Sequence, residues 1–134
     1  MNNISFESFK ELAVSREFLN RNNALGYLRI YASVAKDALP LEGVNITIYK
    51  IIGNYKVIFY RGKTDSSGVI DNIVLPAPRM KNIASLEVPD YTTYQIEARK
   101  DKYYPILDYI IGIFGNIKNE QDIVLQPIIN IEEN

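Results

Sequence analysis

The 134-residue chain contains no histidine, no cysteine and no tryptophan. Histidine is the side chain best suited to proton transfer near neutral pH, cysteine is the strongest nucleophile, and the two supply the usual zinc, iron and copper ligands. Their absence argues against most nucleophilic and metal-dependent mechanisms and forbids disulfides. We therefore expect a protein that is not an enzyme, with no catalytic residue, no metal ion and no cofactor.

The chain also lacks a surplus of charge, because 15 basic side chains face 16 acidic ones. Nucleic acids and anionic membranes attract a basic surplus, so neither is an expected partner. The most apolar run, Tyr109–Phe114, is far shorter than the ~20 residues that cross a bilayer. Met1–Lys10 has no basic cluster followed by an apolar stretch, which predicts synthesis in the cytoplasm without a signal peptide.

Apolar residues recur at three- and four-residue spacing between Asn2 and Asn20, which predicts one short amphipathic helix with a capping box at Ser8 and Glu11. Such a helix is marginal in water unless its apolar face is covered. We therefore expect residues 1–25 to form a helical arm that docks on its own domain or on a neighbouring subunit. The side chains that would make this contact are Phe6, Phe9, Leu12 and Phe18.

Beyond Gly26 the apolar period changes to two, the mark of strands with one buried face. Turn signals stand at Gly53-Asn54 and at Thr64–Gly68. The pattern predicts an all-β fold, a seven-stranded Greek-key sandwich over residues 26–128 with a C-terminal tail at 129–134. The expected strands are a first one after Gly26, then Val44–Tyr49, Tyr55–Arg61, one that begins at Val69, Tyr91–Lys100, Ile106–Phe114 and Asp122–Ile128.

Two further segments are expected to lie outside the strands. Pro76 and Pro78 lack amide donors, so a central strand is not expected to continue through them, and residues 76–89 read as a long irregular connection. Gly115–Gln121 reads as the connection before the last strand.

Several short motifs resemble carboxypeptidase-regulatory-like domains of the prealbumin-like, Ig-like sandwich class. They are GYLRI at 26–30, ALPLEGVNITI at 38–48 and TDSSG at 64–68. LPAP at 75–78, YTTY at 91–94, YYP at 103–105 and LQPI at 125–128 are similar to a subgroup of spore-forming bacteria. The resemblance implies attachment to cortex-lytic or peptidoglycan-binding proteins, or a place in prophage-type particles. It implies scaffold roles for the signature residues and no catalytic residues.

Two kinds of polar side chain in the sequence are candidates for metal binding or catalysis. Asp65 with Asp71, and Asp101 with Asp108, lack the dense oxygen-ligand pattern of a calcium loop, so solvated turn acids are the favoured interpretation. Ser66 and Ser67 have only Lys63 as a nearby base, which favours turn chemistry over a nucleophile.

Tyrosines are the second candidate group. They either form a stacking platform for a sugar or a partner chain, or plug the ends of the sandwich with their hydroxyls in water. Both interpretations stay open. The residues are Tyr91, Tyr94, Tyr103, Tyr104 and Tyr109.

These observations predict a non-catalytic structural or adaptor subunit of a bacterial or phage-type assembly, such as a virion, capsid-decoration, tail or baseplate component. Its partners would be other protein subunits or a second copy of the chain. The alternative is a cell-wall or spore-cortex module that binds peptidoglycan, and a hydrolase that uses carboxylates alone is a third. The predicted partner-binding residues are Phe6, Phe9, Leu12, Phe18, Tyr103 and Tyr104. The final location would be a virion, a tail-like particle or a spore layer.

Overall fold

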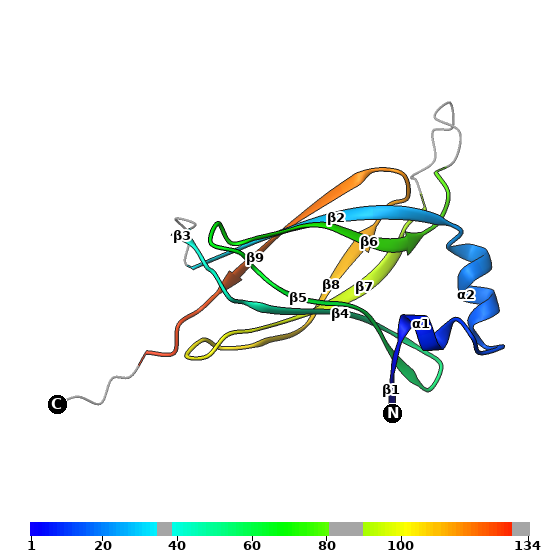
Figure 1. Ribbon diagram of the computed structural model, residues 1–134, viewed down its shortest axis with the longest axis horizontal. Coiled ribbons are helices and arrows are strands. Elements are labelled where there is room, and N and C mark those ends of the chain that lie inside the picture. Colours follow the sequence, from blue (N-terminus) through cyan, green and yellow to red (C-terminus); the bar gives the residue numbers. More distant parts are fainter. Residues whose placement is uncertain (35–38, 81–89, 130–134) are drawn as a thin grey trace.

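The computed structural model describes residues 1–34, 39–80 and 90–129, and these form a sandwich of two β-sheets with two short helices at one end (Figure 1). The all-β sandwich expected from the sequence is confirmed. In chain order the elements are β1 (Asn2–Ser5), α1 (Phe6–Phe9), α2 (Ser15–Arg21), β2 (Ala24–Val34), β3 (Leu39–Pro40), β4 (Asn45–Ile52), β5 (Tyr55–Lys63), β6 (Val69–Ala77), β7 (Thr92–Arg99), β8 (Ile106–Ile113) and β9 (Lys118–Leu125).

The first sheet has the order β1-β5-β4-β7-β8, and all its pairs are antiparallel except β1 with β5. In the second sheet β2 pairs with antiparallel β6 and parallel β9, and its last two residues also pair with β3. The count of seven strands is not reproduced, because the described residues hold nine. The short strands β1 and β3 were not expected from the sequence.

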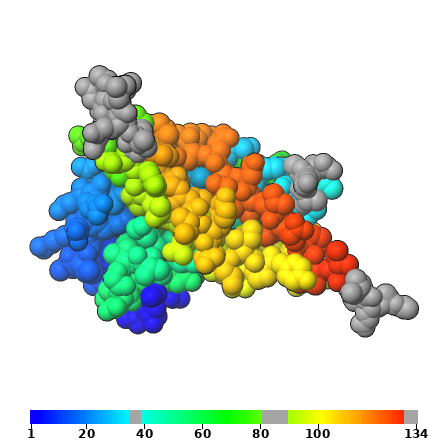
Figure 2. Space-filling model, turned by 180° about the vertical axis from the view of Figure 1, so that it is seen from behind, coloured from blue at the N-terminus to red at the C-terminus, as the bar shows by residue number. Residues whose placement is uncertain are grey.

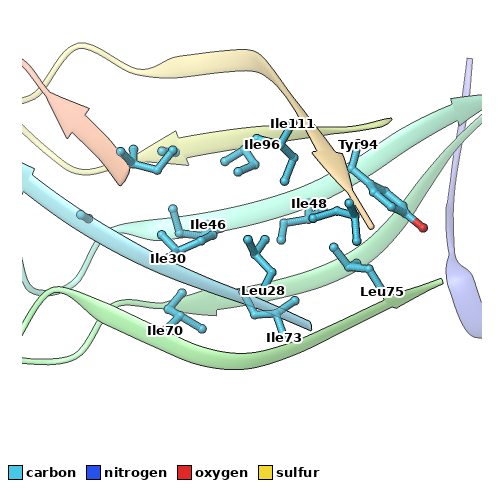
Figure 3. Packing of buried hydrophobic residues seen from close by; sticks show 14 of the residues in the cluster. Leu28, Ile30, Ile46, Ile48, Ile70, Ile73, Leu75, Tyr94, Ile96 and Ile111 are labelled. Carbon is cyan, nitrogen blue, oxygen red and sulfur yellow. The ribbon is translucent and has the colours of Figure 1, made fainter. Parts of the chain in front are cut away.

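The core lies between the two sheets and is built from the alternating apolar residues of each strand (Figure 3). Leu28, Ile30 and Ala32 of β2 are buried, whereas Tyr27 is exposed. The same alternation buries inner-face residues of the other strands, so the predicted period of two is confirmed. These residues include Ile46, Ile48, Ile70, Ile73, Leu75, Tyr94, Ile96, Ala98, Ile111, Ile113, Ile123 and Leu125.

Both predicted turns form as the sequence indicates. Ile52 pairs with Tyr55, so the Gly53-Asn54 pair closes the β4–β5 hairpin. In the Thr64–Gly68 turn, the Asp65 Oδ1 atom accepts hydrogen bonds from the amides of Ser67 (2.9 Å) and Val69 (3.0 Å). Gly68 has a φ of +77°, and a Cβ atom there would lie 2.4 Å from the Ala32 carbonyl oxygen. Only glycine fits this position without a backbone shift.

The prediction of a single helix between Asn2 and Asn20 is wrong. Residues 2–5 form β1, which pairs in parallel with Tyr55–Ile58 of β5, and two short helices follow. The predicted capping box is also replaced, because the Ser5 Oγ atom accepts the Ser8 amide at 3.2 Å and caps α1. An apolar spacing typical of a helix does not reveal that the edge of β5 offers unpaired backbone groups to the first residues of the chain.

The N-terminal segment docks on its own chain through aromatic contacts. Phe9 is completely buried, and its ring packs edge-to-face against Phe18 (6.5 Å between centroids) and Tyr55 (6.1 Å). Phe6 stacks on Phe59 of β5 at 4.6 Å. Of the two docking modes left open by the sequence, the structure therefore has the intramolecular one. The division into an arm, a sandwich and a tail stays a prediction, and residues 130–134 of the tail lie outside the described residues.

Two strand boundaries differ from expectation. β6 continues through Pro76 to Ala77, which is possible because only one neighbour, β2, pairs with it along that stretch. β9 begins at Lys118 rather than Asp122, because an outer strand tolerates polar side chains on its solvent face. Of the expected connection at 76–89, residues 81–89 lie outside the described part of the chain.

Replacement of Phe9 by alanine tests whether the N-terminal segment belongs to the core. We expect Phe9→Ala to lower the free energy of unfolding by about 3–5 kcal/mol, because a fully buried ring is lost and a cavity remains. Urea unfolding followed by circular dichroism measures the change. Val14→Ala, at an exposed position of the same segment, is the matched control and should cost under about 0.5 kcal/mol. Equal values for the two variants would contradict the packing described here.

Candidate functional site

The residues predicted to bind partners lie in two separate places. Phe9 and Phe18 are buried in the core, and Phe6 and Leu12 pack against it, so these four side chains stabilise the chain's own fold. Tyr103 is partly buried at the β7–β8 connection, and Tyr104 beside it is 58% exposed. A binding role for these residues stays a prediction.

The five tyrosines considered as a platform do not share one surface. Tyr91 and Tyr94 stand at the start of β7, whereas Tyr103 and Tyr104 follow its end. Five residues of β7 lie between Tyr94 and the end of the strand, which separates the two groups by at least roughly 17 Å along the strand. Tyr94 is buried, and the exposed Tyr109 accepts a hydrogen bond from Gln121 Nε2 at 3.2 Å.

Two of the acidic residues considered as metal ligands are engaged in local contacts. Asp65 organises its own turn, and Asp71 pairs with Lys118 at 3.2 Å. The amide of Asn72, followed by the Lys118 ammonium, holds the pKa of Asp71 below its ordinary value. Within the described residues, no group of three or more His, Cys, Asp or Glu side chains is placed to hold a metal ion. No helix in those ranges is long and apolar enough to cross a membrane.

A concave site of the described residues is a cleft of about 910 Å³ at the helical end of the sandwich, which we call the α2 cleft. Three segments meet there: α2, the end of β4 with its turn, and the start of β7. Figure 2 shows this end, where the blue N-terminal residues adjoin the blue-green β4–β5 hairpin. The lining residues are Val14, Glu17, Phe18, Arg21, Asn22, Lys50, Ile51, Ile52, Gly53, Pro78, Asp90, Tyr91, Thr92 and Thr93.

The cleft exists because a charged residue continues the inward register of β4. Val44, Ile46 and Ile48 face the core at successive alternate positions, and Lys50 is next in that series. At this end of the sandwich the helix α2, anchored by Phe18, lies beside the sheet (Figure 1). Lys50 is therefore half-buried at a place where a core residue would otherwise stand.

The Lys50 ammonium is held by uncharged groups. Its Nζ atom donates to the Thr93 carbonyl oxygen at 2.8 Å and to Thr93 Oγ1 at 3.3 Å, and it lies 5.9 Å from the centre of the Tyr94 ring. Burial, and then the positive charge of Arg21, lower the pKa of Lys50 below its ordinary value. Glu17 and Asp90 also line the cleft, but their carboxylates do not reverse this direction.

A buried pair of polar side chains fixes the floor of the α2 cleft. Thr92 Oγ1 donates a hydrogen bond to Asn22 Oδ1, and Asn22 Nδ2 donates to the Phe18 carbonyl oxygen at 2.8 Å. These bonds tie the C-terminal end of α2 to the first residue of β7. The cleft is thus built on fixed elements rather than on a loose arm.

Tyr94 lies below Lys50 and closes the core at the same end. Figure 3 shows its hydroxyl directed away from the aliphatic side chains, and the hydroxyl donates to the Pro76 carbonyl oxygen. Burial raises the pKa of Tyr94 well above its ordinary value of 10.0.

Comparison with known proteins finds proteins that are similar to this chain in structure but none that match it in sequence. No protein-family model matches the chain, and no curated protein matches it in sequence. The chain is similar to the solved structure of 3-chlorocatechol 1,2-dioxygenase from Rhodococcus opacus 1CP, with a TM-score of 0.51, 10% identity and coverage of 78% of this chain. Chlorocatechol 1,2-dioxygenase from Pseudomonas putida gives a TM-score of 0.50, 17% identity and 77% coverage. The chain spans 60% of the length of each.

These neighbours correct the functional prediction made from the sequence. Both are enzymes, so the prediction of a non-catalytic structural or adaptor subunit of a phage-type assembly, with a cell-wall module as its alternative, is wrong. The prediction that the chain is not an enzyme is overturned by the same finding. At 10% and 17% identity the likeness is one of fold, and the chemistry of this chain has to be argued from its own residues.

Sequence reasoning did not single out Lys50 or Arg21. The available signal was the register of β4, in which a lysine follows three apolar residues at alternate positions. A lysine in such an inward position is either held in the core by partners or faces a cleft. Arg21 carried no signal of its own, because its position depends on how α2 packs.

The pH dependence of Tyr94→Phe tests the burial of this hydroxyl. At about pH 7 the variant should lose roughly 1–2 kcal/mol of unfolding free energy, because the Pro76 carbonyl loses its donor. Burial raises the pKa of Tyr94 in the folded state. The contribution of its hydroxyl to the free energy of unfolding is therefore complete below the pKa that Tyr94 has in the unfolded chain, and it is lost as the pH rises above that value. The wild type should therefore lose about 1.4 kcal/mol relative to the variant for each pH unit above about 10.

Urea unfolding of both proteins at about pH 7 and about pH 11 measures the two differences. Ionisation of the other tyrosines cancels in the comparison. A difference that stays constant over this range would show that the Tyr94 hydroxyl reaches water in the folded protein.

Proposed function

We propose that this protein binds a small organic anion with an apolar body in the α2 cleft, with Arg21 and Lys50 as the groups that receive the acidic end. The observation that carries the proposal is the presence of two cations in one cleft, close enough for Arg21 to lower the pKa of Lys50. An anion that enters the cleft between Arg21 and Lys50 relieves this repulsion.

The walls of the cleft support a ligand with an apolar portion. Tyr91 is 52% exposed and Ile51 is 39% exposed, and both line the cleft. A volume of about 910 Å³ is within the range of small-molecule sites, which combine apolar walls with a few polar groups. The two solved structures of similar fold are named for chlorocatechol, a small aromatic ring, which is compatible with a ligand of this size class.

We propose further that the sandwich has Greek-key connections and belongs with the carboxypeptidase-regulatory-like domains. Support comes from the Thr64–Gly68 turn with its left-handed Gly68, and from Gly43, whose φ is +79° at the corner before β4. The pairing of β2 with both β6 and the distant β9 is also compatible with that class.

Binding of 3-phenylpropanoate tests the proposed function, with neutral 3-phenylpropanamide as the matched probe. We expect isothermal titration calorimetry to detect binding of the acid. The affinity for the amide should be at least about tenfold lower, because the amide lacks the negative charge that Arg21 and Lys50 would bind. Arg21→Gln should weaken binding of the acid by a similar factor.

Arg16→Gln is the control variant, because Arg16 is an exposed residue of the same helix that does not line the cleft. Its affinity for 3-phenylpropanoate should equal that of the wild type, and thermal unfolding checks that both variants fold. Equal binding of acid and amide, or equal losses in the two variants, would refute the proposal.

A further inference from the structure

We propose that the ligands of the α2 cleft include oxo acids, small carboxylates that also carry a ketone or aldehyde, and that Lys50 forms a covalent imine with their carbonyl carbon. This inference rests on the proposed function, because it uses the same cleft and the same anion-binding Arg21. It adds a bond-forming role for one residue and a chemical class of ligand.

The position of the Lys50 nitrogen is the first support. Both of its hydrogen bonds go to Thr93, one to the carbonyl oxygen at 2.8 Å and one to Oγ1 at 3.3 Å. A neutral amine has two hydrogens, so it keeps both bonds while its lone pair stays available for attack. The neutral, nucleophilic form of Lys50 therefore fits the site without loss of a contact.

The charges around Lys50 are the second support. An amine attacks a carbonyl only in its neutral form, and enzymes favour that form by desolvation and a neighbouring cation. Lys50 has both, because it is half-buried and Arg21 lines the same cleft. The other titratable groups that line the cleft are Glu17 on α2 and Asp90 and Tyr91 before β7, and the net effect still lowers the pKa of Lys50.

Three other lysines of the described residues have carboxylate partners, unlike Lys50. Lys10 pairs with Glu7 at 3.1 Å, Lys56 with Glu97 at 3.8 Å and Lys118 with Asp71 at 3.2 Å. A carboxylate partner stabilises the charged ammonium and opposes nucleophilic attack. The Lys50 ammonium instead donates to the uncharged oxygens of Thr93. These lysines are internal controls within the same molecule.

The proposed step balances without an external oxidant or reductant. Arg21 receives the carboxylate of the oxo acid, and the neutral Lys50 nitrogen attacks the carbonyl carbon. A carbon–nitrogen bond forms and the carbon–oxygen bond breaks. The leaving oxygen takes one proton from the amine nitrogen and one from solvent and departs as water, and the nitrogen keeps its second hydrogen as the nitrogen of a protonated imine. The reaction is reversible, because water regenerates the lysine and the free oxo acid.

Reductive trapping of the full chain tests this step. The protein is incubated with phenylpyruvate, or with 4-oxopentanoate for a longer spacing between the two groups, and cyanoborohydride is added to reduce the imine to a stable amine. Peptide mass spectrometry then locates the adduct. We expect Lys50 to be labelled at least about tenfold faster than Lys56, because the cleft brings carbonyl and amine together.

Three controls connect the label to the cleft. Arg21→Gln should slow labelling of Lys50, Arg16→Gln should not change it, and excess 3-phenylpropanoate should protect Lys50 while leaving Lys56 unaffected. Labelling of Lys50 should also reach half of its maximal rate at a pH below the ordinary lysine pKa, since burial and Arg21 lower the pKa of Lys50.

The outcomes separate this inference from the proposed function. Absence of label at Lys50 with both oxo acids, or equal label on all lysines, overturns the imine proposal. If 3-phenylpropanoate still binds in that case, the anion-binding function stands alone. If neither labelling nor binding occurs, both proposals fail. Label at Lys50 that 3-phenylpropanoate does not block overturns the assignment of the oxo acid to the α2 cleft.

Discussion

The aromatic contacts between the two N-terminal helices and the sheet are the constraint on which the rest of this end of the molecule depends. Phe9 and Phe18 are buried, and Phe59 contacts Phe6, Phe18 and Tyr94. Helices of four and seven residues have little stability of their own, so burial of these rings holds them in place. The position of α2 in turn decides where Arg21 stands and whether Lys50 faces a cleft or open solvent.

The strands were predictable from the sequence wherever a single face is buried. The alternation around Leu28 and Ile48, and the turns at Gly53 and Gly68, each depend on local chemistry that a sequence displays. The N-terminal segment was not predictable in the same way, because β1 forms only when the edge of β5 is present to pair with it. The start of β9 at Lys118 depends on the neighbouring β2 for the same reason.

The candidate site was less predictable than the fold because it joins distant parts of the chain. Thr92 and Asn22 are 70 residues apart, yet their hydrogen bond fixes the floor of the cleft. The aromatic residues suggested a surface for partners, and the structure instead uses most of them as core. The proposed function depends on one lysine in an inward register, and the surroundings of that lysine depend on the helix that lies beside it.

The pairing of β2 with β9 has a consequence for how the chain acquires its structure. Tyr27 is opposite Lys118 and Val34 is opposite Leu125, so more than 90 residues separate partners in adjacent strands. Contacts of such long range close slowly, and during synthesis the second sheet stays incomplete until the C-terminal strand has left the ribosome. Until then β2 has one free edge, which makes the unfinished chain a substrate for chaperones or for aggregation.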